Sequence, residues 1–352
     1  MKEPKKLLVT FDYELFLGRN SGSVANCIIK PTNNVLKILD QYKISAIFFV
    51  DTVYLLRLRE KSAEFDAARK DYDAIIEQLK ALVKCGHYLF PHIHAHWRDA
   101  IYDRALNTWQ LNDLSNYRFH SLNDAEKDRI FKDSLDFLNG IILPLWPGYA
   151  IDSYRAGGWC IQPFSDFKPY FEKYNIINDF SVTPGIKSVS ERNYHDFTNV
   201  KRNVYFFKDD VLKDGAGPFC EFPVSVMQPT AFEKLVGRIE SKILWFLKVK
   251  NSGDGHAAQF SRASVKHYVH QVLSIDNMLL SKMWRYKAFV KQNNYIHFVS
   301  HPKMLSLYNI KLFGLLLKYI YSKNTVISDY QKMKHNYVAQ NINTHRHKAE
   351  FH

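Results

Sequence analysis

Seven short apolar runs, separated by segments with helical periodicity, most constrain how this chain can fold. The runs, which have the apolar, β-branched and aromatic character of buried strands, are 5–12, 44–51, 86–94, 150–156, 176–182, 219–226 and 295–301. Helix-like segments lie between several of them, at 32–42, 71–84 and 124–142. Because strands that alternate with helices are typical of parallel sheets, we predict an α/β fold built on one parallel sheet or barrel.

The composition indicates a globular chain with a basic surface. With 352 residues, 46% of them hydrophobic and 15% aromatic, the chain can bury one large core, and α/β barrels use this length for a single domain. The net charge of +13 suggests an anionic partner, such as a nucleic acid, anionic lipid headgroups or a phosphorylated substrate. The sequence has no recognised nucleic-acid-binding motif, and its basic residues are dispersed, so we expect no nucleic-acid partner.

The cysteines and the N-terminal sequence predict a cytoplasmic protein. The four cysteines lie far apart and form no CxxC pair, which disfavours a disulfide framework and a thiolate zinc site. The sequence MKEPKKLLVTFDYE passes directly from charged residues into a strand, leaving no room for a secretory apolar segment. No stretch reaches the ~18 apolar residues of a membrane span. We therefore expect a protein that is at most peripheral to a membrane.

Three segments differ from the alternating pattern. The polar stretch 184–218 indicates an insertion or a long loop. Residues 304–323 are apolar with scattered lysines and predict a helix, which either docks onto the protein body, the interpretation we favour, or lies in a membrane interface. The polar, His-rich stretch 326–352 predicts a mobile tail. A single domain over 1–325 is therefore expected.

Two acids end the first strand-like run, in the stretch TFDYELF. Asp12 and Glu14 are two residues apart, so in an extended chain both side chains point to the same side. Carboxylates held this close repel each other unless a proton, a cation or a metal ion lies between them. The pair therefore indicates a charged site at the end of a strand.

A second polar group follows the third strand-like run, in the stretch CGHYLFPHIHAHW. It contains His87, His92, His94 and His96 within ten residues. Imidazole is a common zinc ligand, and two histidines with one carboxylate and an open coordination position are typical of hydrolytic metal centres. The alternative is a solvated histidine patch on a loop.

These stretches and four others carry a resemblance to a known family. The motifs, in chain order, are TFDYE, SAIFFVDTVYL, GHYLFPHIHAH, YRAGGW, NDFSVTPG and FVSHPK. In this order the chain resembles the NodB-like polysaccharide deacetylases of carbohydrate esterase family four, and in particular their intracellular branch encoded with surface-polysaccharide genes. The resemblance covers residues 5 to about 305. It implies a distorted (β/α)7 barrel of the polysaccharide deacetylase type, with the active residues at the C-terminal ends of the strands.

The resemblance implies a metal site. Glu14, His92 and His96 would hold Zn²⁺ or another divalent transition metal ion, with His92 and His96 at the positions of the family's HxxxH motif. The motif TFDYE lacks the family's second adjacent Asp, so Asp12 stays an alternative metal carboxylate. His94 is an alternative ligand or, as we favour, a hydrogen-bond partner of His92.

The resemblance also implies the catalytic groups. Asp12 would be the general base, with Arg155 holding its carboxylate ionised and oriented. His301 would be the general acid that protonates the departing nitrogen, and Asp179 would be the carboxylate that keeps it charged. For Asp179 a role in a turn is the alternative, and for Arg155 a surface ion pair.

The aromatic and glycine residues beside these motifs suggest a sugar-binding wall. Trp97 and Trp159 could stack on a sugar ring or belong to the core. Gly157 and Gly158 stand where many family members have a proline and an aromatic residue, so this wall of the groove is altered. The motif NDFSVTPG lacks the family's usual Trp, which puts the leaving-group pocket in doubt.

The resemblance implies hydrolysis of the N-acetyl group of an amino sugar. The predicted substrate is a cytoplasmic precursor of a surface polysaccharide, linked to a nucleotide or to a lipid, since both carriers are anionic and suit a basic protein. The alternative is a non-catalytic member of the same fold that binds glycans or membranes.

Overall fold

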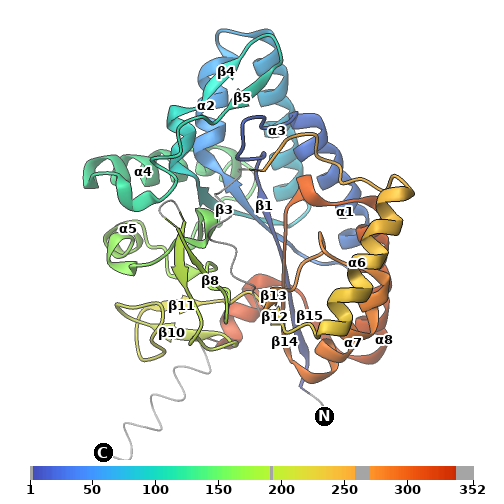
Figure 1. Cartoon of the computed structure of the whole chain (residues 1–352). Coiled ribbons are helices and arrows are strands. Elements are labelled where there is room, and N and C mark those ends of the chain that lie inside the picture. Colours follow the sequence, from blue (N-terminus) through green and yellow to red (C-terminus); the bar gives the residue numbers. More distant parts are fainter. Residues whose placement is uncertain (1–2, 191–192, 258–269, 338–352) are drawn as a thin grey trace, which may run out of the picture.

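The computed structural model describes residues 3–190, 193–257 and 270–337, and all seven predicted strands lie within them (Figure 1). The strands are β1 (Lys5–Tyr13), β2 (Ile47–Asp51), β3 (Tyr88–Ile93), β6 (Ser153–Ala156), β7 (Asn178–Asp179), β11 (Phe219–Glu221) and β14 (Tyr295–Ser300). All neighbouring pairs among them are parallel, in the order β11-β7-β6-β3-β2-β1-β14. Chain order is thus kept across the sheet, and the last strand lies beside the first.

The sheet is curled into a partial barrel. Its outer strands β11 and β14 form no ladder in the described part of the chain, but a backbone hydrogen bond from the nitrogen of Ser225 to the oxygen of His297 (3.2 Å) links the segment after β11 to β14. Two short strands extend the sheet, with β10 (Tyr205–Phe207) antiparallel to β11 and β15 (Val326–Ile327) parallel to β1. The prediction of an α/β fold built on one parallel, barrel-like sheet is confirmed.

Helices lie outside the curled sheet (Figure 1), and all of them except α6 contribute side chains to the hydrophobic core. They are α1 (Lys30–Gln41), α2 (Thr52–Ser62), α3 (Asp66–Lys84), α4 (Asp124–Ile142), α5 (Lys168–Lys173), α6 (Ala231–Phe246), α7 (Met283–Gln292) and α8 (Leu307–Lys323). The helix-like segments of the sequence correspond to α1, α3 and α4. Local sequence fixes some of their ends: Asn123 and Glu126 form a reciprocal capping box at the start of α4.

Short antiparallel strand pairs complete the fold. The predicted insertion 184–218 contains one of them, β8 (Lys187–Val189) with β9 (Tyr194–Asp196), and also contains β10. Two more pairs are β4 (Ile101–Asp103) with β5 (Thr108–Gln110), and β12 (Val226–Met227) with β13 (Gln271–Val272).

Helix α8 corresponds to the predicted apolar helix and docks onto the protein body. Its buried residues include Leu312, Phe313, Leu316 and Leu317, so its apolar stripe belongs to the core. The interpretation that we favoured for this segment therefore holds. None of the described helices combines the length and the apolar character that crossing a bilayer requires.

The chain after α8 differs from the predicted tail. Strand β15 pairs with β1, and Tyr330 and Met333 are fully buried. The Tyr330 hydroxyl also lies 2.7 Å from that of Ser153. The predicted end of the domain at residue 325 is therefore too early. Tyr330, Met333 and Tyr337, three or four residues apart, pack this segment against the core. The rest of the predicted tail, 338–352, lies outside the described residues.

Candidate metal and catalytic site

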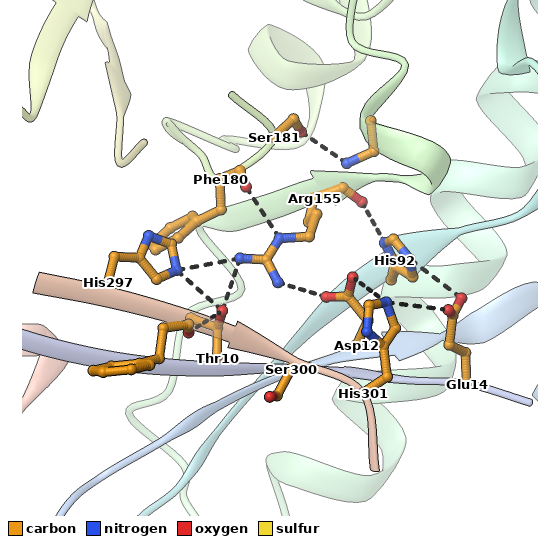
Figure 2. Close-up of polar contacts among 12 residues, drawn as sticks. Thr10, Asp12, Glu14, His92, Arg155, Phe180, Ser181, His297, Ser300 and His301 are labelled. Carbon is orange, nitrogen blue, oxygen red and sulfur yellow. Dashed lines mark hydrogen bonds and ion pairs between the residues drawn. The ribbon is translucent and has the colours of Figure 1, made fainter. Parts of the chain in front are cut away.

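The C-terminal ends of the parallel strands bring the polar residues of the motifs together (Figure 2). Asp12 lies near the end of β1, His92 near the end of β3 and Arg155 in β6, while His301 directly follows β14. Strand register places His92 beside Arg155. Residues that are far apart in the sequence thus share one edge of the sheet, which is where α/β folds build their sites.

Glu14, His92 and His94 form a buried group whose side chains could hold a metal ion. The Nε2 atoms of His92 and His94 are 3.0 Å apart, and Oε2 of Glu14 lies 2.8 Å from Nε2 of His94 and 3.5 Å from Nε2 of His92. All three side chains are almost fully buried. Two imidazoles and a carboxylate that converge in a buried space are a donor set typical of zinc and related ions.

The surroundings of this group favour metal binding. The Nδ1 atom of His92 lies 2.9 Å from the carbonyl oxygen of Arg155, so it carries the proton and leaves the Nε2 lone pair free for a metal. Lys303 donates to Oε1 of Glu14 (2.8 Å), which leaves Oε2 for an ion. Oε2 instead faces the Nε2 atoms of His92 and His94. These contacts orient the ligand atoms toward a common point, so the donor set fits a divalent ion.

His96 does not join this group, in contrast to the predicted pairing of His92 with His96. Strand β3 ends at Ile93 and His94 keeps an extended backbone (φ −109°), so the alternation of a strand carries His94 to the same side as His92. At Ala95 the chain turns into a short 3₁₀ helix, and the ring of His96 instead stacks on Tyr117. Burial lowers the pKa of His96 well below its usual value, so this ring is neutral.

Asp12 pairs with Arg155, as the predicted role of this arginine requires. Nη1 of Arg155 lies 2.5 Å from Oδ1 of Asp12. Burial would raise the pKa of Asp12, but the charges of Arg155, His92 and His301 together outweigh burial and lower this pKa, so the carboxylate is ionised. Asp12 lies outside the group of three possible ligands, which leaves Glu14 as the carboxylate of the metal group.

Arg155 is itself fixed by several partners and is completely buried, which excludes a surface ion pair. Its Nε donates to the carbonyl oxygen of Phe180 (3.0 Å), and its Nη2 donates to the hydroxyl of Thr10 (2.9 Å) (Figure 2). Nη2 also lies 3.3 Å from Nε2 of His297. The guanidinium therefore has little freedom and holds Asp12 in one orientation.

His301 contacts both acids of the first motif and a third one that the sequence did not reveal. Its Nε2 lies 3.5 Å from Asp12 and 3.7 Å from Glu14, and its Nδ1 lies 3.1 Å from Oδ2 of Asp276. Burial opposes protonation of the ring, but the hydrogen bond to Asp276 and the nearby carboxylates outweigh it and raise the pKa of His301. The ring is thus held charged over a wider pH range than a free imidazole.

Asp179 does not contact His301, so the predicted partnership of these two residues is wrong. Its Oδ1 accepts a hydrogen bond from the hydroxyl of Ser181 (2.7 Å), and strand register places it beside Glu221. Burial raises the pKa of Asp179, and burial together with the charge of Asp179 raises that of Glu221 further. Asp179 therefore forms a buried pair of acids with Glu221. It ends β7, which β6 separates from β3 in the sheet.

A pocket of about 420 Å³ opens onto Asp12, Glu14 and His301. Its walls include Tyr117, Gly158, Trp159, Asn193, His195 and Gln271. Trp159 is half-buried and faces this pocket, so it can contact a ligand there. The volume lies in the range of sites that bind small molecules or single sugar residues.

Trp97, the other candidate for stacking on a sugar, lies in the core. It is completely buried between Tyr54 and Trp109, and it does not line the pocket. The same turn into a 3₁₀ helix that redirects His96 also directs Trp97 inward.

The two glycines of YRAGGW permit close packing around the site. A Cβ atom on Gly157 would lie 2.4 Å from the carbonyl oxygen of Ile93 and 2.8 Å from Nδ1 of His94. Gly158 has a φ of +60°, a conformation that side chains rarely adopt, and it faces the hydroxyl of Tyr117. Gly157 therefore leaves room for the ring of His94, and Gly158 belongs to the pocket wall.

Comparison with known proteins supports the fold. No protein-family model and no curated protein matches the chain. Among solved structures, a Mycobacterium smegmatis protein that carries the name polysaccharide deacetylase matches 97% of this chain and 93% of its own, with a TM-score of 0.51 at 11% identity. The chain has the fold of a polysaccharide deacetylase. The Xyl-CE4 domain of a multidomain xylanase from the hindgut metagenome of Trinervitermes trinervoides matches 46% of this chain and 52% of its own, at 15% identity and a TM-score of 0.25.

Two site residues of this polysaccharide deacetylase fold were missed in the sequence. Lys303 follows His301 by two positions, in the short 3₁₀ helix Pro302–Met304, so its closeness to His301 in the motif HPK was the signal for it. Asp276 has no such signal. It is positioned by Ser300, whose hydroxyl accepts hydrogen bonds from the backbone nitrogens of Ile275 (3.0 Å) and Asp276 (3.3 Å).

Proposed function

We propose that the protein is a metal-dependent hydrolase that removes an N-acetyl, or related acyl, group from an amino sugar. The observation that carries this proposal is the arrangement of three elements around one pocket. They are the group of Glu14, His92 and His94, the Asp12–Arg155 pair and the His301–Asp276 pair. In a polysaccharide deacetylase fold, this set supplies a metal site, a base and an acid.

Each residue has a separate role in the proposed reaction. Glu14, His92 and His94 would hold a divalent ion, for which zinc is our proposal, and the ion would supply Lewis acidity and a bound water of lowered pKa. Asp12 takes the proton of the attacking water, because Arg155 keeps its carboxylate ionised and oriented. One acid of the first motif thus binds the ion, and the other acts as the base.

His301 supplies the proton that the departing nitrogen needs. An amide anion is too basic to leave near neutral pH, so the amine must be protonated as its bond to the acyl carbon breaks. His301 lies in the pocket wall. Asp276 holds its Nδ1, so its Nε2 faces Asp12 and Glu14. Asp276 acts through His301 and is a positioning residue.

The substrate that we propose is a precursor of a surface polysaccharide, linked to a nucleotide or a lipid on the cytoplasmic side of the membrane. Both carriers are anionic and suit a chain with a net charge of +13. All four cysteines are free thiols, as in proteins of a reducing compartment. A non-catalytic member that binds glycans or membranes is the alternative, and the complete set of acid, base and ligand side chains argues against it.

The decisive experiment is acetate release from N-acetylated sugar nucleotides and lipid-linked N-acetyl sugars, with metal content measured on the same sample. We expect release that chelation abolishes and a divalent ion restores. Asp12→Asn should lose turnover and keep the metal, whereas Glu14→Gln should lose both. If the fully metallated protein releases no acetate from any of these substrates, the non-catalytic alternative gains support.

The pH dependence of the reaction tests the role of Asp276. If the proton donor is His301, the rate should fall as the pH rises through the pKa of this ring. Asp276→Asn removes the carboxylate that raises this pKa, so the basic limb of the profile should move to lower pH while metal content stays unchanged. An unchanged limb in Asp276→Asn would assign the titration to another group.

A further inference from the structure

Helix α6 lies on the outside of the molecule (Figure 1) and presents apolar side chains to solvent. Within the helix only Glu233 and Gly237 are buried. The residues that we call the α6 surface, each with 51–80% of its area exposed, are Phe232, Leu235, Ile239, Ile243, Trp245, Phe246 and Leu247. Contiguous exposed apolar surface of this kind marks an interaction site.

Basic side chains accompany the α6 surface. Five exposed cations lie on or just after the helix and form no ion pair with another described residue: Lys234, Arg238, Lys242, Lys248 and Lys250. The two acids of α6 have other partners. Glu233 caps the helix and lies 3.7 Å from Arg285, while Glu240 accepts hydrogen bonds from the backbone nitrogens of Leu280 and Ser281. The exposed side of α6 is therefore both apolar and positively charged.

This combination favours an anionic bilayer over a second copy of the chain. A twofold dimer through the α6 surface would place the same cations against each other, and like charges across an interface cost free energy. A bilayer supplies phosphates for the cations and an apolar layer for the side chains between them. Trp245 and Phe246, the most exposed of the seven, are residue types suited to the membrane interface. We propose that the α6 surface docks the protein onto an anionic membrane.

A groove along this surface shares a lining residue with the catalytic pocket. It has a volume of about 930 Å³ and is lined by Leu235, Ile239 and Trp245 at α6, and it reaches Gln271 and Asp276. Gln271 also lines the pocket. A membrane-bound protein would therefore admit a sugar carried on a lipid diphosphate from the bilayer side. This inference rests on the proposed function. Of the two carriers proposed there, it favours the lipid over the nucleotide.

Sedimentation with lipid vesicles tests the docking without requiring catalysis. The vesicles contain phosphatidylcholine alone or together with phosphatidylglycerol. We expect the protein to bind the mixed vesicles and to bind the neutral ones much more weakly. Arg238→Gln/Lys242→Gln should weaken binding by roughly 25-fold, about fivefold for each basic residue removed. Trp245→Ser/Phe246→Ser should abolish binding to both kinds of vesicle.

Matched variants elsewhere on the surface serve as controls. Ile101→Ser/Leu106→Ser removes two exposed apolar side chains (59% and 69% exposed) from the region of the β4–β5 hairpin, and Lys84→Gln/Lys208→Gln removes two exposed cations. Both should bind as the wild type does. Absence of wild-type binding to the mixed vesicles, or equal losses in the control variants, overturns the proposal. So does a wild-type dimer in analytical ultracentrifugation that Trp245→Ser/Phe246→Ser converts to a monomer without any effect on vesicle binding.

The link to catalysis has its own readout. Acetate release from a lipid-linked N-acetyl sugar in vesicles should fall in Trp245→Ser/Phe246→Ser, whereas release from a water-soluble N-acetyl sugar should not change. If the variant releases acetate from the lipid-linked sugar as fast as the wild type does, the route through the groove is overturned. The proposed deacetylation would then stay intact. Loss of release from every substrate in the wild type would refute the deacetylase proposal, whereas vesicle binding would still report on the docking.

Discussion

His94→Ala should strip the protein of its metal, whereas His96→Phe should keep it. Nε2 of His94 lies 2.8 Å from Oε2 of Glu14 and 3.0 Å from Nε2 of His92, so its removal takes one of three converging donor atoms. The loss of affinity should exceed the about 10–100-fold that removal of an outer-shell partner costs. Metal content after dialysis, followed by acetate release, measures both consequences.

The phenylalanine variant is the matched control for this prediction. The ring of His96 stacks on Tyr117, and neither of its nitrogens has a hydrogen-bond partner among the described residues. A phenyl ring keeps this packing and removes only the donor atoms. If His96→Phe loses the metal and His94→Ala retains it, the ligand pair is the HxxxH pair of the sequence motif, and the structural assignment of His94 fails.

The strands and the first acid pair could be predicted because each depends on local pattern. The apolar runs that form β1, β2 and β3 are continuous, as expected of strands covered on both faces. Asp12 and Glu14 share a side because they are two apart near the end of β1. The ion pair between Asp12 and Arg155 joins residues 143 positions apart, and only the family resemblance indicated it.

The remaining site residues depend on where the chain leaves regular structure. The choice between His94 and His96 is decided by the change from extended backbone to 3₁₀ helix at Ala95, which the spacing of three histidines does not reveal. The partner of His301 is decided by a loop that Ser300 holds against the strand end. Asp276, 25 positions before His301, reaches it only through this tertiary contact.

His301→Ala should slow release of acetate from an N-acetyl sugar by about 10²–10⁴, the range typical of general acid–base catalysis. The metal content should stay unchanged, because His301 is not one of the three converging ligands. The basic limb of the pH profile, which follows the raised pKa of this ring, should disappear as well. Steady-state rates on metal-replete protein across a range of pH measure both effects.

The nature of the leaving group separates proton donation from positioning. A sugar amine must be protonated as it leaves, whereas the phenolate of an activated acetate ester leaves without help, so the ester should be hydrolysed by His301→Ala with a much smaller loss. His301 also lies 3.5 Å from Asp12 and 3.7 Å from Glu14, and a histidine that only oriented these acids would affect the attack on both substrates alike. Equal losses on the amide and the ester would therefore assign His301 to the placement of the base and the metal ligand, and the proton would have to come from elsewhere in the pocket.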